Sequence, residues 1–199
     1  MIEEKGDRER GGSTLAVLEE LSGAGMGRAA MALSELMHER ISLTSEVHLF
    51  SPSEVLRLLD GQQGLKAGVF VRILKGVEGG ILVLLPEESL LALIRLLAGK
   101  RVDRSAALTE EDCSVLREVG NILASSYLSA LSDCLGLILL PSPPELFLDR
   151  ATKAMEGLLQ GMVVQEMAVV ESHFEAGRGE VQGRFFIMAD ISSVQACGS

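Results

Sequence analysis

The chain has 199 residues, a formal net charge of −10, and 47% apolar but only 4% aromatic residues. This length supports one substantial hydrophobic core, which must be built from Leu, Val, Ile, Ala and Met because aromatic residues are so few. A surface of this acidity repels phosphate backbones and anionic bilayers, so the composition argues against nucleic-acid binding and membrane-surface binding.

The sequence predicts a cytoplasmic protein. No run of about 18 uninterrupted apolar residues indicates a transmembrane helix. The charged start, MIEEKGDRERGG, lacks the apolar segment of a signal peptide, and we expect residues 1–12 to form a disordered tail. Cys113, Cys134 and Cys197 are too few and too scattered for a disulfide framework or a zinc cluster, and reduced thiols are typical of the cytosol.

The first half predicts a long helix, a strand, a short helix, two strands and a further helix that leads into a polar linker. The two adjacent strands are separated by GVEGG, a glycine-rich turn that is typical of a hairpin. We expect these elements at about 13–38, 41–50, 51–61, 65–76, 79–86 and 87–98, with the linker reaching 107.

The second half repeats this order of elements. Its long helix opens with Thr109 and Asp112, which resemble a capping box in which Asp replaces the usual Glu or Gln. The elements are expected at 109–136 (helix), 137–148 (extended), 149–161 (short helix), and 162–177 and 179–189 (hairpin strands).

Direct self-similarity accompanies the repeated order of elements. AVLEELSGAGMGRAAMALSELM aligns with SVLREVGNILASSYLSALSDCL, so that Leu18 meets Leu116 and Glu20 meets Glu118. Such a repeat is best explained by duplication of one supersecondary unit. We therefore expect an α/β (α+β) fold with pseudo-two-fold symmetry, in which the long helices pack on a shared, mainly antiparallel sheet.

The two repeats, about 13–98 and 109–199, are expected to form one domain, because either repeat alone would bury too little apolar surface.

The 109–136 helix has two contrasting faces. An apolar stripe at three- and four-residue steps predicts the side that faces the core; it contains Leu116, Val119, Leu123, Tyr127, Ala130 and Cys134. Another face combines Glu118 and Asn121, the only asparagine in the chain, with small serines at 125, 129 and 132. Because a solvated helix face usually carries long charged side chains, this face suits the close approach of another protein.

The same helix resembles the CheC-type chemotaxis phosphatases, a family that includes CheC, CheX and FliY. The family signature is matched in type and spacing by Ser114, Glu118, Asn121 and Pro144. The resemblance covers the chain from about residue 14, because GAGMGRAAMALSELM in the first half is similar to a Gly- and Ala-rich stretch of the family.

The resemblance implies a phosphatase that acts on the aspartyl phosphate of a CheY-like receiver domain. Asn121 would be exposed and would hold the attacking water, and Glu118 would pair with a lysine of the receiver. Mg²⁺ would belong to the receiver, so no metal site and no cofactor of the chain's own is expected. In the first half the corresponding Glu20 and Gly23 form a degenerate site that lacks the asparagine.

Three other interpretations remain open. In the simplest interpretation, Glu118 and Asn121 are ordinary exposed helix residues. In the second interpretation, the chain is a non-catalytic scaffold like the middle domain of the flagellar switch protein FliM, which resembles CheC but lacks the Glu/Asn pair. In the third it chiefly binds the receptor deamidase CheD, through the short helix at 149–161.

Overall fold

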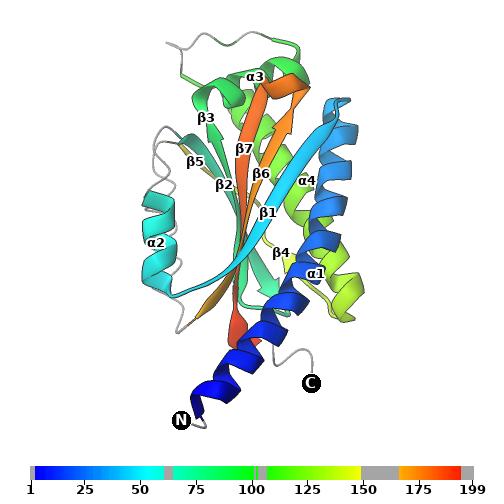
Figure 1. Cartoon of the computed structure of the whole chain (residues 1–199). Coiled ribbons are helices and arrows are strands. Elements are labelled where there is room, and N and C mark those ends of the chain that lie inside the picture. The colour runs from blue at the N-terminus through cyan, green and yellow to red at the C-terminus, as the bar shows by residue number, and fades with distance from the viewer. Residues whose placement is uncertain (1–2, 61–64, 101, 103–106, 149–165, 194–199) are drawn as a thin grey trace.

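One mixed sheet-and-helix body contains all the described helices and strands, as a computed structural model shows (Figure 1). The structure is described for residues 3–60, 65–100, 102, 107–148 and 166–193. The helices are α1 (Glu3–Met37), α2 (Pro52–Asp60), α3 (Glu87–Ala98) and α4 (Glu110–Leu135), with a 3₁₀ turn, η1, at Gly177–Gly179. The strands are β1 (Ile41–Phe50), β2 (Leu65–Lys75), β3 (Gly79–Pro86), β4 (Leu140–Pro141), β5 (Glu145–Leu148), β6 (Met167–Ala176) and β7 (Val181–Asp190).

The seven strands form a single antiparallel sheet in the order β1-β6-β7-β3-β2-β4, and β5 pairs with β2 beside β4. The predicted hairpins β2–β3 and β6–β7 lie at the centre and join through β3 and β7. Each hairpin receives its outer neighbour from the other repeat: β1 pairs with β6, and β4 and β5 pair with β2. The two repeats are therefore interlocked in one sheet, and the expected fold class is confirmed.

Each face of the sheet carries its own hydrophobic core. Figure 1 shows α1 and α4 on one face and α2 on the other. The larger core joins the sheet to α1, α3 and α4 and includes Leu33, Leu93 and Leu123. The smaller core lies under α2 and includes Val55 and Phe186. Alternating side chains on both sides of the strands supply these two cores.

The long helices approach each other closely because one glycine leaves room for an aromatic ring. A Cβ atom on Gly25 of α1 would lie 2.4 Å from the ring of Tyr127 on α4. That ring is 2% exposed and packs edge-on against Phe185, with ring centroids 5.8 Å apart. Burial raises the pKa of Tyr127 far above its ordinary value, so its hydroxyl stays protonated at any physiological pH.

Two expectations differ from the structure or fall outside its description. Helix α1 begins at Glu3, ten residues before the expected start and inside the segment expected to be a disordered tail. The segment 3–10 is rich in Glu, Lys and Arg, which are good helix formers, so the helix extends past the sheet without needing a core (Figure 1). The expected short helix at 149–161 lies outside the described residues. No helix of the described part is both long enough and apolar enough to cross a membrane.

Candidate active site on helix α4

Helix α4 is held at its first turn by a reciprocal pair of hydrogen bonds. The Thr109 hydroxyl accepts from the Asp112 backbone N–H at 3.3 Å, and the Asp112 carboxylate accepts from the Thr109 backbone N–H at 2.8 Å. The Lys100 ammonium lies 3.1 Å from the other Asp112 oxygen. The predicted capping box is confirmed, with Asp in the position that Glu usually takes.

The charge of Asp112 is protected although the side chain is only 2% exposed. Burial alone would raise the pKa of this carboxyl group. The hydrogen bonds from Thr109 and the ion pair with Lys100 outweigh burial and hold the pKa below its ordinary value. Asp112 therefore stays ionised near neutral pH, where its charge also favours the N-terminal end of the helix dipole.

The inner face of α4 follows the predicted stripe along most of the helix. The buried members are Leu116, Val119, Leu123, Tyr127 and Ala130. Cys134, in the last turn, was expected among them but is exposed. Near the middle, Gly120 seats α4 directly on β2, since a Cβ there would lie 2.3 Å from a methyl group of Val69.

The outer face of α4 carries the candidate pair. Ser114, Glu118 and Asn121 follow one another at four- and three-residue steps and so line one side of the helix. Glu118 and Ser114 are exposed. Within the described residues, the Glu118 carboxylate and the Asn121 carboxamide have no hydrogen-bond or ion-pair partner. Both polar groups are available to a molecule that docks on this face.

Asn121 is half-buried, whereas the sequence predicted an exposed side chain. It lies at the margin of the outer face, on the side that continues through Ala124 and Leu128, both of which are buried. A half-buried side chain has fewer accessible rotamers than a solvated one. The amide is therefore held more firmly than a fully solvated asparagine would be.

The three serines of this face differ in their environment. The Ser125 hydroxyl donates to the Asn121 carbonyl oxygen at 2.6 Å, so it folds back on the helix. The Ser132 hydroxyl accepts from the Leu139 backbone N–H at 3.1 Å and fixes the chain after α4. Ser129 stays exposed. All three side chains are short, so this part of the outer face carries no long projecting side chain, as the sequence indicated.

Pro144, the fourth signature position, is half-buried in the loop between β4 and β5. Both strands pair with β2, and α4 packs over β2. The structure thus places Ser114, Glu118 and Asn121 on one helix and Pro144 on the adjoining edge of the sheet.

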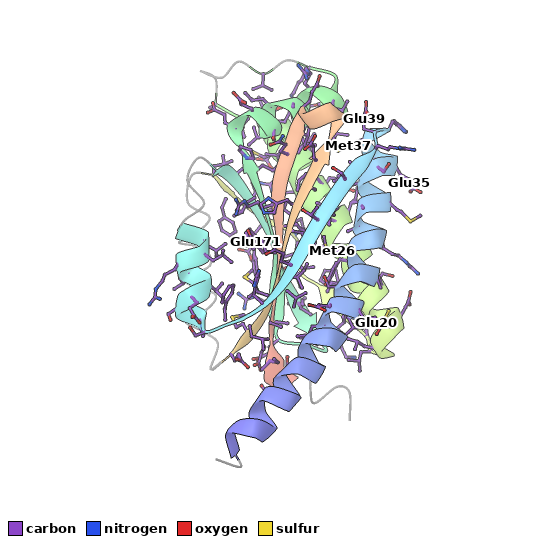
Figure 2. All side chains as sticks on the ribbon, viewed as in Figure 1. Glu20, Met26, Glu35, Met37, Glu39 and Glu171 are labelled. Carbon is purple, nitrogen blue, oxygen red and sulfur yellow. The ribbon has the colours of Figure 1, made fainter. Side chains whose placement is uncertain are left out.

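The corresponding positions of the first repeat are open but incomplete. Glu20 and Gly23 are both exposed on the outer side of α1, and Figure 2 shows Glu20 on this helix. A Cβ added to Gly23 would meet nothing within 4 Å, so packing does not require a glycine there. Glu46, which stands where the signature has proline, is exposed on β1. The pair found on α4 has no counterpart on α1.

A groove between the two long helices was not anticipated from the sequence. It has a volume of about 390 Å³ and is lined by Met31, Ala32 and Glu35 of α1 and by Ser125 and Ser129 of α4. Met31 is 66% exposed, although it lies in a helix rich in buried apolar residues. Only the packing of α1 against α4 creates the groove, so no local pattern in the sequence predicts it.

Metal ligands do not gather in the described part of the chain. No group of three or more His, Cys, Asp or Glu is placed there to hold a metal ion. His38, His48 and His173 lie on different elements: His38 directly after α1, His48 on β1 and His173 on β6.

Comparison with known proteins connects this geometry to a family. A family model described as the CheC-like family matches residues 111–148, which contain all four signature positions. The CheY-P phosphatase CheC of Bacillus subtilis (strain 168) is 31% identical over 186 residues, which cover 90% of this chain and 89% of that protein. The chain belongs to the CheC-like family. It is therefore a CheC-family chemotaxis protein.

Two solved structures share the fold. FliY from Thermotoga maritima superposes with a TM-score of 0.67 at 23% identity, with 93% of each chain covered. A chain of the CheX–CheY–BeF₃–Mg²⁺ complex from Borrelia burgdorferi gives a TM-score of 0.57 at 19% identity, covering 84% of this CheC-like chain and 95% of that one. At these identities the likeness establishes the architecture, and activity must be argued from the site.

Proposed function

We propose that this CheC-like protein is a phosphatase that hydrolyses the aspartyl phosphate of a CheY-like receiver domain. The observation that carries the proposal is the pair on α4, an exposed Glu118 and a half-buried Asn121 one turn apart, whose polar groups have no partner among the described residues. The name of the Bacillus subtilis relative, CheY-P phosphatase, supports the substrate. The Borrelia complex, which joins CheX to CheY, supports a receiver as the partner.

Asn121 is assigned to the attacking water. Phosphoryl transfer passes through a loose transition state, so catalysis depends mainly on placing the nucleophile in line with the phosphorus. A carboxamide oxygen accepts a hydrogen bond from water while its NH₂ group donates to another oxygen. The restricted position of Asn121 at the margin of the outer face suits this task, because an oriented group costs less entropy when it acts.

Glu118 is assigned to docking. Its carboxylate is exposed and has no cation partner in the described part of the chain, so it is free to pair with a lysine of the receiver. Any Mg²⁺ would be held by the receiver, and the chain would need no cofactor of its own.

The first repeat is proposed to be catalytically silent. Glu20 matches Glu118, but Gly23 has no side chain with which to orient a water molecule.

A non-catalytic role is the competing proposal, and the shared fold favours it as much as it favours catalysis. The FliM middle domain, the scaffold considered above, has the same architecture, with a TM-score of 0.62 at 15% identity, and a fold alone does not carry an activity. CheD binding through 149–161 is a further proposal, on residues outside the described part.

One assay with three readouts separates these proposals. A CheY-like receiver from the same organism is phosphorylated, and its loss of phosphate is followed with and without the purified protein, beside pull-downs with the receiver and with CheD. A phosphatase accelerates the loss of phosphate at substoichiometric concentration. Binding of the receiver without acceleration would contradict the phosphatase proposal and favour a scaffold. Capture of CheD alone would favour the third.

A further inference from the structure

The groove between α1 and α4 lies beside the candidate pair. Ser125, which lines it, is one helical turn beyond Asn121, and Ser129 is two turns beyond. At 1.5 Å per residue, Ser129 lies about 12 Å along α4 from Asn121. Met31 and Glu35 line the opposite wall on α1 (Figure 2 labels Glu35).

A protein that docks over Asn121 would also reach α1. A specific interface buries about 800 Å² on each partner, which corresponds to a patch about 16 Å in radius. Packed helices lie about 8–10 Å apart, so a patch centred on Asn121 extends across the groove to the outer side of α1. On the α4 side, small serine side chains at 125, 126 and 129 line this path.

The groove offers an apolar anchor between two charged side chains, Arg28 and Glu35. Met31 is 66% exposed, the largest exposed fraction among the large apolar side chains of the described residues. Arg28 at the rim is already paired with Asp133 at 3.1 Å. Methionine is enriched at protein interfaces because its flexible side chain adapts to the partner surface. A single exposed apolar residue is ordinary, but here it lines a groove continuous with the proposed site.

We propose that this groove is the second half of the receiver-docking surface, with Met31 as its apolar anchor. The inference rests on the proposed function and adds a role for the first repeat: α1 docks the receiver while α4 carries the catalytic pair. Duplication has then been followed by division of labour, because α1 has lost the asparagine but keeps a contact surface next to the working site.

The test compares two matched substitutions of exposed apolar residues. Met31→Gln keeps an unbranched side chain of similar length and a good helix former, so α1 is unaffected. Leu74→Gln is the control, because Leu74 is also exposed, at 60%. Its neighbour Ile73 is buried under the helices, so Leu74 points to the opposite face of the sheet. The measured quantities are the Kd for a beryllofluoride-activated receiver, and the half-saturating receiver concentration and maximal rate of dephosphorylation.

We expect Met31→Gln to raise the Kd and the half-saturating concentration about tenfold while the maximal rate stays unchanged, because part of one buried apolar side chain is lost from the interface. Leu74→Gln is expected to match the wild type. A Kd for Met31→Gln within about twofold of the Leu74→Gln value would overturn the docking surface.

The failure of this inference and the failure of the proposed function are distinguishable. If Asn121→Ala keeps full turnover in the same assay, the catalytic assignment fails, while a weakened Kd of Met31→Gln still supports the groove. If the activated receiver does not bind at all, both are overturned.

Discussion

Glu118 and Asn121 share a helix face but not an environment. Glu118 is exposed, so its charge is solvated until a partner excludes the water around it. Asn121 is half-buried beside the buried Ala124 and Leu128 and has less freedom to move. This difference predicts a division of roles in which Glu118 contributes to association and Asn121 to the chemical step.

Glu118→Ala tests the docking half of that division. A charge-assisted contact in an interface is typically worth about 1.5–3 kcal/mol, so the half-saturating receiver concentration should rise about 10- to 150-fold. The maximal rate should change little. Steady-state kinetics measure both quantities, and Glu175→Ala, an exposed glutamate on β6, is the control. A collapsed maximal rate with normal concentration dependence would instead assign Glu118 to the transition state.

At the scale of the element, the close packing of α4 on the sheet sets the position of the candidate pair relative to the sheet. Gly120 precedes Asn121 directly and allows the helix to touch β2. The capping box at Thr109 and Asp112 fixes the start of the helix two turns before Glu118. Both features are structural, yet a change in either would reach the site through the helix.

Gly120→Ala should destabilise the protein and impair turnover together. The new methyl group would lie 2.3 Å from Val69, which is buried and β-branched and has little room to move. Overpacking costs about 1–3 kcal/mol, partly offset by the helix propensity of alanine. Gly23→Ala is the matched control, because a Cβ at Gly23 would meet nothing within 4 Å. This substitution should stabilise the fold by up to about 1 kcal/mol. Denaturant unfolding measures both; a stabilised Gly120→Ala would contradict the close seating of α4.

Asp112→Asn should reveal a pH-dependent contribution of the capping box. The folded pKa of Asp112 lies below its ordinary value, so its charge stabilises the fold above about pH 4 and this contribution is lost as pH falls through the folded pKa. The difference in unfolding free energy between wild type and variant should be about 1 kcal/mol at pH 7 and should shrink on acidification. A difference that is independent of pH would contradict a contribution from the charge of Asp112.

At the scale of the whole molecule, the repeats are bound together by strand exchange. β1 of the first repeat completes the hairpin of the second, and β5 of the second completes that of the first. Catalysis in one repeat and docking in the other can therefore act on the same partner, because both long helices lie on the same face of one sheet (Figure 1).

Local periodicity predicted most elements but could not predict their partners. The period-two pattern of β1 and the cap signals of α4 are local, and both elements appear at the expected bounds. The pairing of β1 with β6 joins residues more than a hundred positions apart, and many registers satisfy the same alternation. The exposure of Cys134 likewise departs from the helical period and depends on tertiary packing.

The candidate site was predictable in part for the same reason. Steps of three and four residues place Ser114, Glu118 and Asn121 on one face of any helix. The half-burial of Asn121 and the groove beside Met31 depend on how α4 sits between the sheet and α1. These properties arise from tertiary packing and needed the structure.

Restoring the missing asparagine tests the silence of the first repeat. Gly23→Asn meets open space, so it should fold normally, and it should add at most a weak second activity because Ala16 and Glu46 also differ from the signature. Glu20→Ala should leave the maximal rate unchanged. Both variants are measured by receiver dephosphorylation. Loss of turnover in Glu20→Ala would contradict the assignment of the active site to the second repeat.

The most direct test of the central claim is the maximal rate of receiver dephosphorylation by Asn121→Ala at saturating receiver. The unpartnered, half-buried amide contributes little to stability, so the variant should unfold within about 1 kcal/mol of the wild type. Removing one oriented catalytic group typically costs about 100-fold or more, so the rate should fall to that of the receiver alone while the receiver still binds. A folded Asn121→Ala protein that retains the wild-type maximal rate would contradict the account.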